Sequence, residues 1–347
     1  MTTAEALPTG RVAEALDDYW DAVSANDAER ALQVVGAALD DGARLSAVLD
    51  DVVAACQRRV GGLWLDGEWS VAREHAATAV SEYVVRALLA RVGGEAGHEP
   101  AEPGERPSPA LLVACAEREW HALPALVVCT LLTEAGHRVR FLGGDVSTRT
   151  LQGALLDVPT QAVLISASLA SSLLFVRRHV ETASHSGIPT VVGGHGFDPA
   201  GRRARALGAT AQASGGADVA GVVAGLPARV RPVEPLTGPG PSEAALLAPR
   251  TTAVARGAMS RLAERPDAPE GHLADVLADQ LPVVVGCVVS GLLVDEPDVV
   301  RETGGWLGRV LDSRGGGPEL VDLALAAVRD ELHDFPTAVT LLDAATA

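Results

Sequence analysis

The chain has 347 residues, a formal net charge of −17 at neutral pH and 28 basic residues, all of them arginines because the sequence contains no lysine. The lack of lysine excludes pyridoxal phosphate and retinal Schiff bases and the P-loop, and the negative charge opposes direct binding to nucleic acid. With 48% hydrophobic but only 3% aromatic residues, a chain of this length is expected to build two or three cores of Ala, Val and Leu.

Cysteine usage and the first residues predict the cellular compartment. The four cysteines form no CxxC pair, and Cys56, Cys115 and Cys129 lie in apolar stretches, which is typical of buried thiols in a reducing environment. The N-terminus has neither a basic start nor an apolar core, and no uninterrupted apolar run approaches the ~20 residues of a membrane span. We therefore expect a cytoplasmic protein with no membrane partner.

Residues 10–93 predict a bundle of four helices. The expected helices are 10–25, 27–42, 43–64 and 70–93. Val80, Val84 and Leu88 form one apolar stripe on the last of them, and Ser70 is a suitable N-cap for it. The segment 95–109 is rich in Pro, Glu and Gly, which indicates a linker.

Between residues 108 and 228, short β runs alternate with helical stretches. The expected strands are 110–116, 139–143, 162–168, 190–194 and a weaker 209–214. The helical stretches are 130–137, 171–187 and 198–208. Apolar strands separated by helices predict a Rossmann-like parallel sheet covered on both faces, and ligands of such sheets bind beyond the carboxyl ends of the strands.

A second linker is expected at 231–243, and the rest of the chain shows no strand pattern. The expected helices are 244–265, 271–296, 298–315 and 318–335. Residues 243–347 should therefore form a third, all-helical module of the chain.

Two motifs carry the candidate chemistry. Trp64 is followed after nine residues by Glu74 and His75, near the junction of two expected helices, while Glu119-Trp120-His121 follows the first expected strand. A neutral imidazole can bind a metal through one nitrogen while its other nitrogen donates to an acceptor that fixes the tautomer. His121 is the candidate metal ligand, and both Glu119 and Asp145 are candidates for that acceptor.

Four segments in chain order resemble the cobalamin-binding domain shared by methionine synthase, corrinoid methyltransferase proteins and cobalamin photoreceptors. They are Glu119 to Pro124, Leu142-Gly143-Gly144-Asp145, Ser166 to Leu169, and Gly193-Gly194. The resemblance implies that His121 is the lower ligand of the cobalt and that Leu142, Gly143 and Asp145 form a cofactor-binding turn. Ser166, Ser168, Gly193 and Gly194 are expected to line a slot for the displaced nucleotide tail, because hydroxyls can bond to it and glycines allow close approach.

Pro124 stands where that family has a glycine. A proline is tolerated in the first turn of a helix, where its missing N–H costs nothing. We therefore expect a helix to begin at this point.

The spacing of Trp64, Glu74 and His75 resembles the cap of light-sensing regulators that depend on adenosylcobalamin. The resemblance implies that Trp64 packs on the adenosyl group and that Glu74 and His75 line the upper face of the corrin. In those regulators a histidine follows the tryptophan and captures the cobalt after illumination, but here that position is Leu65. The helix-turn-helix DNA-binding module of that branch has no counterpart in this sequence.

The order of a cap, a cobalamin domain and a helical module resembles photocobilins, in which a globin-like domain binds a bilin. The resemblance implies a second chromophore, biliverdin, held by residues of the third module. The candidate contacts are Arg250, His272, Cys287, Arg301, Trp306 and Arg309. A non-covalent bilin is preferred over a thioether to Cys287, since this cysteine lies in an apolar run.

These resemblances predict a cobalamin-dependent photoreceptor that acts as a regulatory binding protein and not as an enzyme. We expect a homodimer that signals to an effector protein which the sequence does not identify. Two alternatives remain: a corrinoid carrier of a methyltransferase system, and a signalling scaffold without photochemistry.

Overall fold

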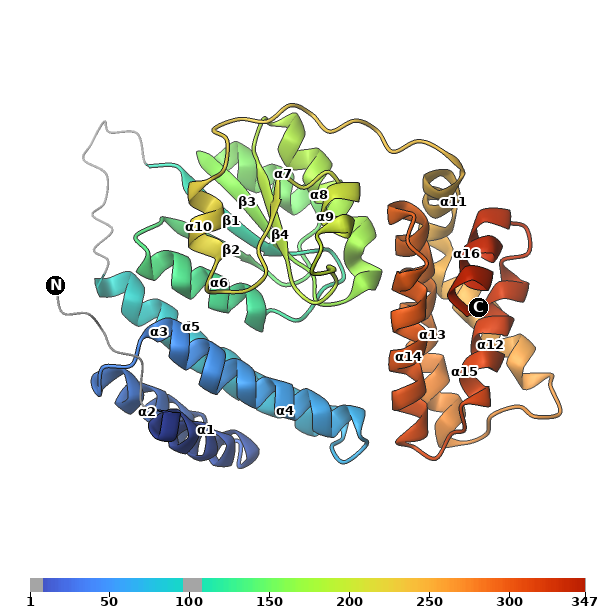
Figure 1. The fold of residues 1–347 in the computed structure, drawn as a ribbon, viewed down its shortest axis with the longest axis horizontal. Helices are drawn as coiled ribbons and strands as arrows, with labels where there is room; N and C mark the ends of the chain where they lie inside the picture. Colours follow the sequence, from blue (N-terminus) through green and yellow to red (C-terminus); the bar gives the residue numbers. More distant parts are fainter. Residues whose placement is uncertain (1–8, 96–107, 347) are drawn as a thin grey trace.

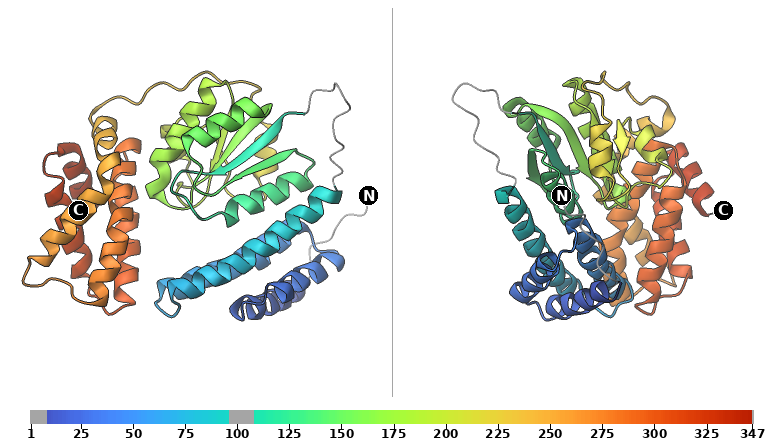
Figure 2. Two further views of the ribbon diagram at one scale, coloured as in Figure 1. Left: turned by 180° about the vertical axis from the view of Figure 1, so that it is seen from behind. Right: turned by 60° about the vertical axis from the view of Figure 1, so that its left-hand side comes forward.

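The computed structural model describes residues 9–95 and 108–346. Figure 1 shows three parts, with a helical cap below an α/β part and a helical module beside both. Figure 2 shows the same arrangement from behind and from the side. The third part contacts both the cap and the α/β part.

The cap is helical throughout its described length, apart from short turns. Its elements are α1 Thr9–Ser24, α2 Ala28–Asp40, α3 Leu45–Ala47, the π-helical η1 Val48–Val53, α4 Ala54–Leu65 and α5 Val71–Glu95. The expected helix 43–64 is one continuous run from α3 to α4, but at its centre the N–H of Ala54 donates to Leu49 O, one residue further than in an α-helix. Ser70 accepts a hydrogen bond from the N–H of Arg73 at 3.3 Å, which confirms the predicted N-cap.

The predicted parallel sheet is confirmed. Its strands are β1 Ala110–Cys115, β2 Val139–Gly143, β3 Thr160–Ser166, β4 Thr190–Gly193 and β5 Ala211–Gln212, and they pair in parallel in the order β2-β1-β3-β4-β5. Helices α6 Leu123–Glu134 and α10 Val219–Ala224 cover one face, and α7 Thr148–Asp157, α8 Leu173–His185 and α9 Arg202–Ala206 cover the other. Side chains alternate between the faces, as a strand requires: Leu111 and Val113 pack toward α6, while Leu112 and Ala114 pack toward α8.

Several predicted boundaries in this part are wrong. Helix α6 begins at Leu123 with Pro124 in its first turn, which confirms the helix start expected at that proline but makes the helical stretch 130–137 too short at its N-terminal end. Helices α7 and α10 were not predicted, and Ser147 caps α7 by accepting from the N–H of Thr150. The weak run 209–214 contributes only the two residues of β5, and the stretch 198–208 is helical only over α9.

The third part is all-helical, as predicted, although its globin-like arrangement stays a prediction. Its elements are α11 Pro239–Leu247, η3 Ala248–Arg250, α12 Thr251–Ala263, α13 His272–Val294, α14 Asp298–Asp312, α15 Glu319–Glu331 and α16 Pro336–Thr346. The expected linker 231–243 is too long, because α11 already begins at Pro239. Helix α13 packs against η2 Ala170–Ser172 and α8 of the α/β part.

Helix α13 is long and apolar enough to cross a membrane by length and composition, with a mean hydropathy of 1.9 in its most apolar window. In the fold, 67% of that window is buried among the other helices. A core helix of a folded domain has these same properties, so one such helix is weak evidence for a membrane span. Its apolar character is explained by its central place in the third part.

Burial of His179 predicts that stability falls in mild acid. His179 lies in α8 with no exposed surface, and among the described residues neither ring nitrogen meets the geometry of a hydrogen bond, although the backbone of Val146 is close enough to oppose part of the effect of burial. Burial lowers the pKa of this imidazole to about 4, so the unfolded chain binds a proton near its ordinary pKa of about 6.5 while the folded chain does not. Its contribution is complete above pH 6.5 and is lost as the pH falls toward 4, by about 2 kcal/mol between pH 7 and pH 5.

The measurement is the free energy of unfolding at several pH values for the unmutated protein and for His179→Leu. The variant should lose this part of the pH dependence. His185→Leu changes an exposed histidine of the same helix and should keep the original slope. Equal slopes for His179→Leu and the unmutated protein would show that His179 is not the group responsible.

Candidate functional site

The loop after β1 orients the imidazole of His121. Nδ1 of His121 lies 2.5 Å from Oε1 of Glu119, and the same oxygen accepts the backbone N–H of His121 at 3.0 Å. Because a carboxylate only accepts hydrogen bonds, the proton of the ring is placed on Nδ1, which leaves Nε2 with a free lone pair. The His121 side chain is 54% exposed, so this nitrogen is accessible to a ligand.

Glu119 is completely buried but fully paired. Its second oxygen accepts the N–H groups of Ser168 and Leu169 at 2.6 and 2.9 Å, which ties the loop after β1 to the loop after β3. Burial raises the pKa of Glu119, but hydrogen bonds from His121 and Leu169 and the charge of His121 outweigh it, so the pKa of this carboxyl lies below its usual range. The carboxylate is therefore available to orient His121 at neutral pH.

The other candidate acceptor, Asp145, has a different role. It donates its N–H to Glu119 O at 2.8 Å, and its carboxylate accepts the N–H of Arg118 at 2.7 Å. Arg118 in the loop after β1 and Asp145 in the turn after β2 both adopt a left-handed backbone, and Gly143, the last residue of β2, also has a positive φ. Left-handed backbone at non-glycine residues is uncommon and tends to occur at functional sites. Leu142 is half-buried at the end of β2.

A cavity of about 600 Å³ lies between α6 and the carboxyl ends of the strands. Ser166, Gly193 and Gly194 line it, together with residues of β1, α6 and the cap, whereas Ser168 does not. A Cβ on Gly194 would lie 2.4 Å from Ala167 O, and one on Gly193 would lie 3.2 Å from Ala213 O. Larger residues at these two positions would crowd the carbonyl oxygens of the neighbouring loops. Glycine avoids this and leaves the cavity open along the backbone.

One residue that lines this cavity, Gln212, has a buried polar atom, Oε1, with no partner in the described structure. Oγ of Ser168 is also buried without a partner there, but Ser168 does not line the cavity. Buried polar atoms are normally hydrogen-bonded, and a nucleotide with ribose hydroxyls offers a donor to Oε1 of Gln212. The cavity, this acceptor and the accessible Nε2 of His121 therefore fit a corrinoid with a nucleotide tail. Gln212 was not predicted, since one glutamine in a weak strand gives no signal in the sequence.

The cap brings Glu74 close to His121. The hydrogen bond to Glu119 raises the pKa of His121, burial lowers it, and the charges of Glu119 and then Glu74 raise it again, with a raised pKa as the net result. Oγ1 of Thr78 lies 2.9 Å from Oε1 of Glu74 and 3.0 Å from Oε1 of Gln57, and its single proton is donated to one of them at a time. Gln57 lines the cavity. His75 is exposed and lies 3.5 Å from the other oxygen of Glu74. Gln57 is a second site residue that sequence reasoning missed.

Trp64 lies at the end of α4 and is held by the third part. Its ring stacks on Trp306 of α14, with centroids 6.3 Å apart and planes at 25°. Arg314 donates to Trp64 O at 3.1 Å, and Ser313 donates to Leu65 O at 2.7 Å. Helix ends leave carbonyl groups without intrahelical partners. The third part supplies a donor to Leu65 O and a donor to Trp64 O in addition to the N–H of Gly67.

The structure does not assemble the six candidate bilin contacts into one pocket. Trp306 stacks on Trp64, Arg301 pairs with Asp298 and Ala344 O, and none of the six lines either of the two described cavities. His272 and Cys287 lie on the same helix α13, about 22 Å apart along its axis at 1.5 Å per residue. Arg250, His272 and Arg309 are exposed. That these six residues bind a bilin stays a prediction.

A thioether to Cys287 is disfavoured by its surroundings. The thiol is buried, and burial raises its pKa to about 11. The thiolate is the reactive form of cysteine. The preference for a non-covalent bilin is therefore consistent with the structure.

Comparison with known proteins matches the first two parts of the chain. Residues 109–223 match a family described as B12 binding domain, and residues 15–89 match a second family with the same description. No curated protein matches the chain.

Solved structures show similar folds at low identity. The monomethylamine corrinoid protein of Methanosarcina barkeri is 17% identical, with a TM-score of 0.50, over 60% of this chain and 97% of that one. A methanol:cobalamin methyltransferase complex of Methanosarcina barkeri is 17% identical, with a TM-score of 0.31, over 61% and 81%. A novel cobalamin-binding protein of Desulfitobacterium hafniense DCB-2 is 18% identical, with a TM-score of 0.31, over 60% and 96%.

At this identity only the shared fold with the first of these structures carries weight. The two family matches coincide with the helical cap and the parallel-sheet part, and the geometry of His121 and of the cavity fits the same cofactor. The chain contains two B12-binding domains, a helical cap and a Rossmann-like domain, and is a cobalamin-binding protein.

Proposed function

We propose that this protein is a photoreceptor that binds adenosylcobalamin with its own base displaced and with His121 as the lower cobalt ligand. The observation that carries the proposal is the environment of Trp64. This aromatic ring and Glu74 both belong to the B12-binding cap, the charge of Glu74 acts on His121, and the ring is fixed by a partner in the third part. A flat apolar ring and a carboxylate together suit a nucleoside, which offers a base to pack on and hydroxyls that donate.

Adenosylcobalamin supplies a cobalt–carbon bond that visible light breaks. The residues of the chain then determine the structural response. Trp64 and Glu74 hold the nucleoside before illumination, and its departure changes the surroundings of Trp64. Because Trp64 stacks on Trp306, a shift of the ring disturbs the contact between the cap and α14. Light thereby changes the balance between two arrangements of the three parts, and the protein acts by binding and not by catalysis.

A non-covalent biliverdin in residues 243–347 is the second half of this proposal. Its support is the order of the three parts along the chain. The six candidate contacts add no support, because they do not form one pocket. A homodimer built partly on the helical module would give the receptor a surface through which to signal.

A corrinoid carrier of a methyltransferase system is the competing function. The shared fold with the monomethylamine corrinoid protein is compatible with it. A carrier must expose its methyl group to a second enzyme, whereas the turn after Trp64 is packed against Ser313 and Arg314 of the third part. This closed junction favours the photoreceptor.

The absorption spectrum of protein loaded with adenosylcobalamin in the dark tests the proposal. Illumination should change the visible bands, because the upper ligand leaves the cobalt. Protein loaded with hydroxocobalamin has no cobalt–carbon bond and should show no such change. Biliverdin added in the dark should give a band at longer wavelength than any cobalamin band. A spectrum unaltered by light refutes the photoreceptor, and the lack of the additional band refutes only the bilin half.

A further inference from the structure

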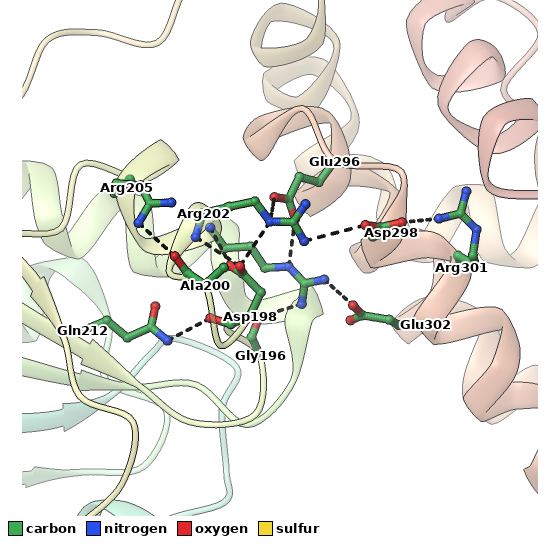
Figure 3. Close-up of polar contacts among 11 residues, drawn as sticks. Gly196, Asp198, Ala200, Arg202, Arg205, Gln212, Glu296, Asp298, Arg301 and Glu302 are labelled. Atoms are coloured by element: carbon green, nitrogen blue, oxygen red, sulfur yellow. Dashed lines mark hydrogen bonds and ion pairs between the residues drawn. The ribbon is translucent and has the colours of Figure 1, made fainter. Parts of the chain in front are cut away.

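A buried arginine joins the α/β part to the third part. Arg203 in α9 is 1% exposed, and Figure 3 labels its partners Gly196, Glu296 and Glu302 at the junction. Its Nη1 donates to Gly196 O at 3.2 Å, its Nε to Glu296 at 3.2 Å and its Nη2 to Glu302 at 2.7 Å. One guanidinium therefore binds a loop of the α/β part and two carboxylates of the helical module.

The loop that Arg203 holds forms one wall of the cavity. Gly194, His195, Phe197 and Pro199 all line it, and Gly196 lies between them with its N–H bonded to Ala167 O. The far end of the loop is fixed by Asp198, whose carboxylate accepts the N–H groups of Arg202 and Arg203. Gln212, which has the unpaired Oε1 in the cavity, donates to Asp198 O at 2.9 Å.

The acceptors for the buried charge come mostly from the other module. Glu296 is 12% exposed and also pairs with Arg202 at 3.2 Å, and Asp298 adds a weaker contact to Arg202. A buried guanidinium without these carboxylates is strongly unfavourable, since removing one partner leaves an uncompensated charge. Undocking of the helical module would replace these carboxylates with water, so Arg203 would lose two of the contacts that fix its guanidinium on Gly196 O.

We propose that Arg203 is a positioning residue for the nucleotide tail of cobalamin, and that docking of the helical module through Glu296 and Glu302 shapes the tail slot. This inference rests on cobalamin binding alone and is independent of the upper ligand and of light. The slot is lined by residues of β1, β3 and β4 and not by His121, so we expect the tail and not the corrin to respond to the position of the loop.

Cobinamides lack the nucleotide tail, and they separate this role from a purely structural one. Arg203→Met should bind methylcobalamin 5- to 10-fold more weakly than the unmutated protein, which is of the order expected for the loss of one hydrogen bond. Binding of methylcobinamide should stay unchanged. Affinities of the protein in its full length are measured by equilibrium dialysis with absorption detection. The unmutated protein should bind methylcobalamin more tightly than methylcobinamide.

Two further variants make the test decisive. Glu302→Gln lies on the helical module and keeps Arg203 intact, so it should lower the same affinity ratio by a smaller factor and provides the result if Arg203→Met does not fold. Arg205→Met removes an exposed arginine of the same helix that bonds only to Ala200 O among the described contacts, and it should change neither affinity. Equal losses for both ligands, no loss for either, or no preference for the tailed ligand in the unmutated protein would overturn the proposal.

Discussion

Replacement of His121 by alanine is expected to weaken cobalamin binding by about 100-fold or more and to shift its visible bands. Even an outer partner of a metal-bound histidine is typically worth 10- to 100-fold in metal affinity, and His121 is the proposed ligand itself. The tail slot remains in the variant, since none of its lining residues contacts the imidazole in the described structure. Residual binding should therefore persist, but without a protein nitrogen on the cobalt.

Titration with hydroxocobalamin, followed by absorption, measures both effects. Glu119→Gln should cause a smaller loss, about 10-fold, because the ring keeps its nitrogen but loses the carboxylate that fixes the proton on Nδ1. His185→Ala changes an exposed histidine at the end of α8 and serves as the control. If the bound spectrum of His121→Ala equals that of the unmutated protein, His121 is not the cobalt ligand.

The central sheet was predictable because its signal is local. Residues 110–116 and 162–165 are continuous in apolar residues, and a buried parallel strand requires this pattern whatever surrounds it. Helix α7 was missed because its local signal is weak. The stretch from Thr148 to Asp157 has few apolar residues, and only Leu151 is buried. Such a helix depends on its N-cap and on packing against α8 more than on its own pattern.

The acceptor for His121 could not be chosen from the sequence. Glu119 and Asp145 are both carboxylates near the expected site, and spacing alone favours neither. The structure separates them through backbone geometry: the left-handed conformations of Arg118 and Asp145 place the Asp145 carboxylate on the N–H of Arg118. Glu119 is then left between His121 and the loop after β3.

The role of the third part was also beyond sequence reasoning. Trp306 was assigned to a bilin because it lies in the helical module, but it stacks on a residue 242 positions earlier in the chain. Arg203 gave no signal, since one arginine in RRAR resembles any solvated helix. Contacts between distant segments depend on how the parts dock, and no local periodicity records that.

Replacement of Trp64 by alanine should reduce the preference for adenosylcobalamin over methylcobalamin by roughly 30-fold, which corresponds to about 2 kcal/mol. The unmutated protein should prefer the adenosyl form because the indole gives the nucleoside an apolar surface, while a methyl group is too small to use it. Trp306→Leu removes the stacking partner but keeps Trp64. It should produce part of the same loss, because the ring is then less well fixed.

Tyr83→Ala removes an exposed aromatic side chain of α5 and should leave the preference intact. The measurement is the ratio of the two dissociation constants, determined in the dark. Equal affinities in the unmutated protein would contradict the roles proposed for the cap and favour the methyl carrier, whereas a preference that survives Trp64→Ala would place the nucleoside contact on Glu74 and its neighbours.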